Sequence, residues 1–188
     1  MFFRIKHKWY LALLVVMVSL PISWKLGAWE HLTESASPLA QQIGIGILTG
    51  MLSLGIDGAL HETFKRTLGQ RYLNVFERHG RAVLGAMRWP AYIAGGLMAA
   101  LTEEPLFRGV LLLSFDNRAI GIGMAAVVFA FCHWMRLEFI GFWFWAILEG
   151  LLFGILMVLT GSLLVPMIAH GIHDLVGYRV FQALIRRK

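Results

Sequence analysis

The ten residues Leu101–Val110 read LTEEPLFRGV and place three charged side chains inside an apolar run over Trp89–Phe115. A carboxylate at the centre of a bilayer costs roughly 2.5–3.5 kcal/mol even on the milder insertion scales, so stability alone does not account for two adjacent ones. Glu104 and Arg108 are four residues apart and can pair on one helix face. Glu103 points about 100° away from that face and has no evident partner on its own helix.

Two interpretations of this stretch are open. Glu103, Glu104 and Arg108 form a structural ion-pair cluster, or the carboxylates line a cavity and take part in chemistry. Pro105 bears on the choice, because it cannot donate a hydrogen bond to the carbonyl of Leu101 and it disfavours a helical conformation at Glu104. We therefore expect a kink here, which would expose the backbone to the cavity that the carboxylates line.

The composition is that of an integral membrane protein. The chain has 188 residues, of which 58% are hydrophobic and 15% are charged, and its mean hydropathy is +0.68. Soluble domains are about 45–50% apolar and about 25% charged. The formal charge of +6 does not indicate nucleic-acid binding, because the basic residues lie in short runs between apolar segments, as in cytoplasmic loops. The single cysteine, Cys132, excludes an intrachain disulfide.

The apolar segments predict an all-α, polytopic transmembrane bundle with about six spans. The expected spans are residues 9–24, 39–60, 89–115, 119–134, 139–159 and 162–184. The first is short, and we expect Pro21 to break it. Of the segments between the spans, those on one side hold most of the Lys and Arg residues, Arg136 included, whereas those on the other hold only Lys25 and Arg118. This asymmetry predicts a multi-pass protein of the cytoplasmic membrane with both termini in the cytoplasm.

Residues 61–88 are too polar to span a bilayer. They contain six Lys or Arg residues, and their apolar side chains recur at helical spacing. This pattern predicts an amphipathic helix on an anionic membrane surface. The chain is thereby divided into residues 1–88, with two spans and the amphipathic segment, and residues 89–188, a core of four spans.

Three of the predicted spans carry ionisable groups at membrane depth. These groups are Glu103 with Glu104, then His133, then His170 with Asp174. A carboxylate in an apolar cavity holds a proton more readily and is a usable general base near neutral pH. It would take a proton from water and return it to a leaving amine, while the imidazoles orient the water or stabilise an oxyanion. Such a set would hydrolyse a peptide bond without a covalent intermediate.

Other functions of the same residues stay open at this point. Two histidines and a carboxylate also suit a divalent metal such as zinc, which would make a metal-dependent protease. A non-enzymatic membrane protein, such as an immunity factor or a small transporter, would use them as a proton or ion relay. Asp57 is interpreted as an interfacial residue and Glu149 as a hydrogen-bond partner between helices. A cysteine nucleophile is disfavoured, because Cys132 and His133 are adjacent and do not face each other on a helix.

Three motifs, in order and on successive apolar segments, resemble those of the CPBP intramembrane endopeptidases, the family of the type II CAAX prenyl proteases. The EExxxR motif reads EEPLFRG at residues 103–109. The FxxxH motif is found at Phe129–His133, and HxxxD, a rarer form of HxxxN, at His170–Asp174. The resemblance covers about residues 89–180.

The resemblance implies roles for the first two motifs. Glu103 would be the base that activates water, and His133 would help to position that water. Glu104 would pair with Arg108 and shape the site, with Phe129 in support. No metal or other cofactor is expected on this basis. The substrates implied are membrane-embedded or lipid-anchored proteins and peptides, such as those with prenylated C-termini, and not nucleic acids.

The third motif departs from its commoner form. By the resemblance, His170 and Asp174 would stabilise the oxyanion, and His173 is a further supporting candidate. An asparagine amide can donate a hydrogen bond, whereas an ionised carboxylate only accepts. Asp174 is therefore either protonated, and donates as an amide would, or it orients His170, which then acts as the donor.

Overall fold

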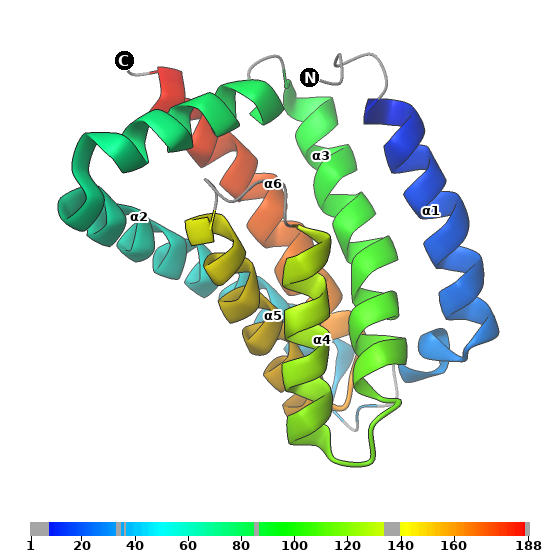
Figure 1. Cartoon of the computed structure of the whole chain (residues 1–188). Coiled ribbons are helices and arrows are strands. Elements are labelled where there is room, and N and C mark those ends of the chain that lie inside the picture. Colours follow the sequence, from blue (N-terminus) through cyan, green and yellow to red (C-terminus); the bar gives the residue numbers. More distant parts are fainter. Residues whose placement is uncertain (1–7, 33–34, 36, 85–86, 134–139, 187–188) are drawn as a thin grey trace.

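The computed structural model describes residues 8–32, 35, 37–84, 87–133 and 140–186, and these residues form helices and connecting turns only (Figure 1). The all-α prediction is therefore confirmed for the described part of the chain. The six α-helices, one 3-10 helix and two π-helices in these ranges are α1 (Lys8–Lys25), η2 (Ala28–Leu32), α2 (Leu39–Leu84), α3 (Trp89–Met98), η3 (Ala99–Glu103), η4 (Pro105–Leu112), α4 (Arg118–Cys132), α5 (Ile140–Thr160) and α6 (Leu164–Arg186). The predicted loop with Arg136 lies outside the described residues.

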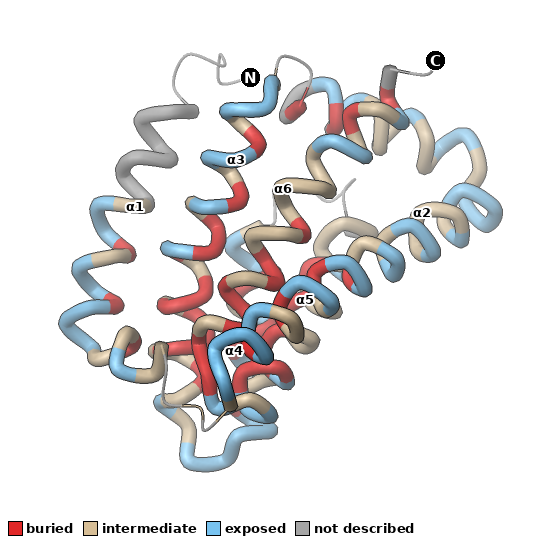
Figure 2. Tube along the Cα trace, turned by 180° about the vertical axis from the view of Figure 1, so that it is seen from behind, coloured by how far each residue is buried: buried red, intermediate tan, exposed pale blue. Residues whose placement is uncertain are grey.

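Two of the described helices are long and apolar enough to cross a membrane. They are α2, over Leu39–Arg78, and α5, over Gly141–Thr160, and α4 is apolar but shorter. Large apolar side chains are exposed on the outside of the bundle, for example Leu48 at 72% and Leu159 at 78%. The buried residues gather where η3, η4, α5 and α6 meet (Figure 2). An apolar outside around a partly polar inside is what a bilayer requires.

Helix α2 corrects the predicted boundary between a span and a separate amphipathic segment. The helix continues through Leu60 and changes direction at Gly69, where φ is 57° and ψ is −139°. Only glycine adopts such a conformation without strain. Beyond Gly69 the second half of α2 runs across the end of α6 (Figure 1). There the rings of Phe76 and Phe181 pack edge to face, with 4.2 Å between their centroids. Glu62 pairs with Lys65 and Arg66 within the helix, so the charge does not interrupt it.

The prediction that Pro21 breaks the first span is also wrong, because α1 continues through this residue to Lys25. A proline removes one hydrogen bond of the helix, and neighbouring groups in a helical bundle can satisfy the carbonyl that it frees. The start of α1 and the end of α6 lie at the same end of the bundle (Figure 1).

The stretch around Pro105 forms a continuous helical rod from α3 through η3 and η4 (Figure 1). Glu104, which was expected to leave the helical conformation, has φ −62° and ψ −46°. The wider π-helical turns on either side accommodate the proline in place of a sharp break. Near η3, the rod lies close to α6: a Cβ atom added to Gly96 would be 2.6 Å from the carbonyl oxygen of Gly171.

Candidate active site

Glu104 holds the centre of the site together. Its Oε1 atom lies 3.0 Å from Nη1 of Arg108 and 2.7 Å from Nδ1 of His170, and the Glu104 and Arg108 side chains are fully buried. The predicted pair four residues apart is therefore confirmed. The guanidinium of Arg108 lies 4.7 Å from the centre of the Phe129 ring and 5.6 Å from that of Phe153. These aromatic faces stabilise a cation that is removed from water.

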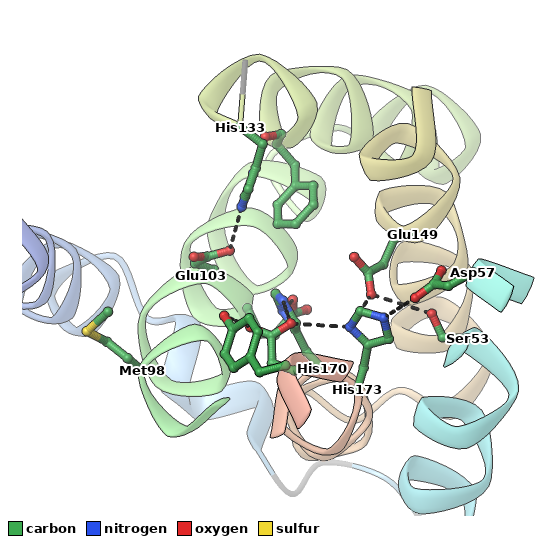
Figure 3. A network of polar contacts seen from close by, with 12 residues as sticks. Ser53, Asp57, Met98, Glu103, His133, Glu149, His170 and His173 are labelled. Carbon is green, nitrogen blue, oxygen red and sulfur yellow. Dashed lines mark hydrogen bonds and ion pairs between the residues drawn. The ribbon is translucent and has the colours of Figure 1, made fainter. Parts of the chain in front are cut away.

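Glu103 faces a different helix from its neighbour Glu104. Its Oε2 atom lies 3.7 Å from Nε2 of His133, which caps the C-terminal end of α4 (Figure 3). Nδ1 of His133 lies 2.8 Å from the carbonyl oxygen of Phe129. A carbonyl only accepts, so Nδ1 carries a proton, and the ring in its neutral form presents the lone pair of Nε2 to Glu103. The Phe129 ring also contacts His133 and His170, at centroid distances of 4.4 and 5.9 Å.

With His133 neutral, this arrangement leaves two acceptors facing each other across a short gap. Among the described residues, Oε2 of Glu103 is a buried oxygen without a hydrogen-bond partner. The side chains of Glu103 and His133 as a whole remain 27% and 30% exposed. In contrast, His170 is 4% exposed and forms part of the wall.

Asp174 joins the centre of the site to a second group of polar side chains. Its Oδ1 atom lies 3.9 Å from Nε2 of His170 and 3.2 Å from Nδ1 of His173. Its Oδ2 atom accepts a hydrogen bond of 2.7 Å from the hydroxyl of Tyr178. The surroundings of Asp174 are thus donors, but the hydrogen bond is to His173, whereas the distance to His170 is too long for one. With these contacts, all eight residues that the sequence singled out belong to one connected set.

Sequence reasoning missed the carboxylates on the other side of His173. Asp57, interpreted as interfacial, places Oδ2 at 2.6 Å from Nε2 of His173 and accepts a hydrogen bond from the indole N–H of Trp145. Glu149 places Oε1 at 2.9 Å from Nδ1 of His173 and accepts a hydrogen bond of 3.4 Å from Ser53, so its interpretation as a partner between helices is confirmed. The spacing along each helix was an available signal. Ser53 and Asp57 on α2, and Trp145 and Glu149 on α5, are each four residues apart and so share a helix face.

Ser53, Asp57, Trp145 and Glu149 also line a cavity of about 30 Å³ between α2 and α5. Such a volume holds about one or two waters. In the described ranges, no three His, Cys, Asp or Glu side chains are arranged to hold one metal ion.

Comparison with known proteins identifies the family of this site. Residues 85–176 match the family described as type II CAAX prenyl endopeptidase, Rce1-like. No curated protein and no solved structure matches the chain. The matched segment contains all eight residues that the sequence singled out, whereas Asp57 lies outside it. Residues 85–176 therefore form a domain of the Rce1-like type II CAAX prenyl endopeptidase family, a family of membrane endopeptidases that act on proteins and peptides.

Proposed function

We propose that the chain is an intramembrane endopeptidase of the glutamic type, in which Glu103 activates water. The observation that carries this proposal is the 3.7 Å gap between Oε2 of Glu103 and Nε2 of His133. In the neutral form of His133 both atoms are acceptors, since the ring proton is on Nδ1 and bound to a carbonyl. One water in this gap can donate a hydrogen bond to each atom, which directs its own lone pairs toward a substrate carbonyl.

The same geometry supports a complete proton balance. Glu103 takes a proton as the water oxygen bonds to the carbonyl carbon, and the carbonyl oxygen becomes an oxyanion. When the C–N bond breaks, Glu103 returns that proton to the amine nitrogen, and the other product is a carboxylic acid. As an imidazolium, His170 is the donor to the oxyanion: Nδ1–H is bound to Glu104, and Nε2–H is 3.9 Å from Asp174, too far for a hydrogen bond to it.

We also propose that six helical segments cross the membrane, with both termini in the cytoplasm. Helix α6 has 23 residues, and about 20 residues span the apolar core of a bilayer. Helix α4 has only 15 residues, a rise of about 22 Å. If α4 begins at the outer surface, then His133 at its far end lies in the cytoplasmic half of the bilayer. A site at that depth suits membrane-embedded or lipid-anchored substrates that approach from the cytoplasmic leaflet.

A second candidate function has one observation in its favour. Carboxylates and imidazoles alternate in a row through Asp57, His173, Asp174, His170 and Glu104, with gaps between 2.6 and 3.9 Å. Rows of this kind serve as proton relays in membrane transporters. Proton-coupled flux from the purified protein in liposomes would favour this function over hydrolysis.

The direct test of hydrolysis is Glu103→Gln in the purified full-length chain. Three quenched fluorescent peptides serve as probes: a farnesylated CAAX peptide, its unprenylated counterpart, and a peptide with a hydrophobic tail. We expect the parent protein to cut at least one probe and the variant to be slower by about 10²-fold or more, because general-base catalysis typically contributes 10²- to 10⁴-fold. Glu62→Gln is the matched control, since Glu62 pairs with Lys65 and Arg66 on the outside of α2. Undiminished cleavage by Glu103→Gln, with the fold intact, would contradict the proposal.

A further inference from the structure

His173 is enclosed by carboxylates from three helices (Figure 3). Nε2 lies 2.6 Å from Asp57 on α2, and Nδ1 lies 2.9 Å from Glu149 on α5 and 3.2 Å from Asp174 on α6. With the carboxylates ionised, an imidazole with one of them at each nitrogen satisfies both only when both nitrogens carry a proton. His173 is thus a double donor, and its Nδ1 proton is shared between Glu149 and Asp174.

The carboxylates that hold this ring are themselves oriented. The Trp145 indole N–H donates to Asp57, and the Ser53 hydroxyl donates to Glu149 over 3.4 Å. Glu149 is 3% exposed and Asp57 is 25% exposed as side chains. Burying charged groups is costly, so a cluster with several carboxylates around one imidazole is a poor device for stability alone. Its position next to the active site suggests what else it does.

The cluster reaches the active site through one oxygen atom. Oδ1 of Asp174 faces two rings, His173 at 3.2 Å and His170 at 3.9 Å, and only the first distance is that of a hydrogen bond. The hydroxyl of Tyr178 holds the other oxygen at 2.7 Å. If His173 released Oδ1, a movement of about 1 Å would bring Asp174 into hydrogen-bond contact with Nε2 of His170. That contact would occupy the proton assigned above to the oxyanion.

We propose that Asp57 is a positioning residue that acts through His173 to keep Asp174 away from His170. The inference rests on the proposed function, because it takes Nε2 of His170 as the donor to the oxyanion. Asp57 belongs to α2 and lies outside residues 85–176. The helices that precede the family domain therefore complete its active site.

A double-mutant cycle tests the proposal with the peptide that the parent protein cuts. Asp57→Asn should lower kcat by about tenfold with little change in KM, because it weakens the alignment of a transition-state donor. The same substitution in an Asp174→Asn background should lower kcat less than about twofold, since the carboxylate that it restrains is absent. Equal factors in the two backgrounds would show that Asp57 acts by another route and would overturn the proposal.

Further measurements keep each outcome decisive. Trp145→Phe, which removes the indole N–H that donates to Asp57, forms an equivalent cycle if Asp57→Asn does not fold. Glu62→Gln is the control on α2 that should change neither background. If the Asp174→Asn protein is too slow to assay, ¹⁵N chemical shifts of the His170 ring replace kcat. These shifts should differ between the parent protein and Asp57→Asn. They should be the same in Asp174→Asn and in the double variant. Identical changes caused by Asp57→Asn in both backgrounds would contradict the proposal. Normal cleavage by Glu103→Gln would instead remove the proposed function itself, so the two failures are distinguishable.

Discussion

The close approach of α3 to α6 offers a sharp test of how the site is held, through the substitution Gly96→Ala. The added Cβ atom would lie 2.6 Å from the carbonyl oxygen of Gly171, whereas ordinary contact begins at 3.4 Å. Both partners are helical backbone and cannot turn aside. The two helices must therefore separate locally by about 0.8 Å.

This displacement falls on the centre of the site. His170 directly precedes Gly171, and Glu104 continues the rod that begins with α3. The hydrogen bond of 2.7 Å between His170 and Glu104 would lengthen toward about 3.5 Å, where it is effectively lost. Overpacking of this kind costs about 1–3 kcal/mol of stability. Misplacement of reacting groups by about 1 Å can cost about 10²-fold in rate, so we expect kcat to fall by about 10- to 100-fold.

The assay pairs peptide cleavage with thermal unfolding of the purified protein. Gly123→Ala is the matched control, because nothing lies within 4 Å of a Cβ atom at this position on α4. An alanine inside a helix is favoured over glycine by about 1 kcal/mol, so the control should unfold at a higher temperature and cleave as the parent does. A Gly96→Ala protein with the parent's rate and unfolding temperature would refute the reasoning.

Two further predictions concern the buried charge and the metal. Arg108→Met should lower the free energy of unfolding by about 3–5 kcal/mol, because it leaves Glu104 buried without its cation, and adding Glu104→Gln should recover part of that loss. Equal unfolding temperatures for the single and double variants would contradict this account. A strong chelator should leave peptide cleavage unchanged, and elemental analysis should find no stoichiometric zinc. One bound divalent ion per chain, with activity restored by adding it back, would overturn that prediction.

The local part of the site could be predicted from the sequence, because it depends on spacing along single helices. Glu104 and Arg108 are four positions apart, and this spacing alone places them on one helix face. The contact between Asp57 and His173 could not be predicted in this way, since the two residues are 116 positions apart. It depends on how α2 lies against α6, where Gly46 and Gly50 allow the backbones to approach.

The boundaries of the fold show a similar division. The charge density after Leu60 suggested that a span ends there, but charged residues paired along one helix do not end it. The backbone conformation of Gly69 instead changes the direction of α2. Hydropathy identifies only α2 and α5 as candidate spans among the described helices, partly because α6 and the rod from α3 to η4 carry the ionisable residues of the site. The ionisable residues that the site needs lower the hydropathy of those helices, so a criterion based on composition does not identify them as spans.

The π-helical turns around Glu103 and Glu104 have a consequence for engineering. At about 4.4 residues per turn, successive side chains are about 80° apart, compared with 100° in an α-helix. The wider turn lets two consecutive carboxylates serve two different neighbours, one on α4 and one on α6. A straight α-helical scaffold that received only the letters EExxxR would direct one carboxylate away from its partner. A designer who grafts this motif must therefore transfer the irregular hydrogen-bond register of residues 99–112 along with it.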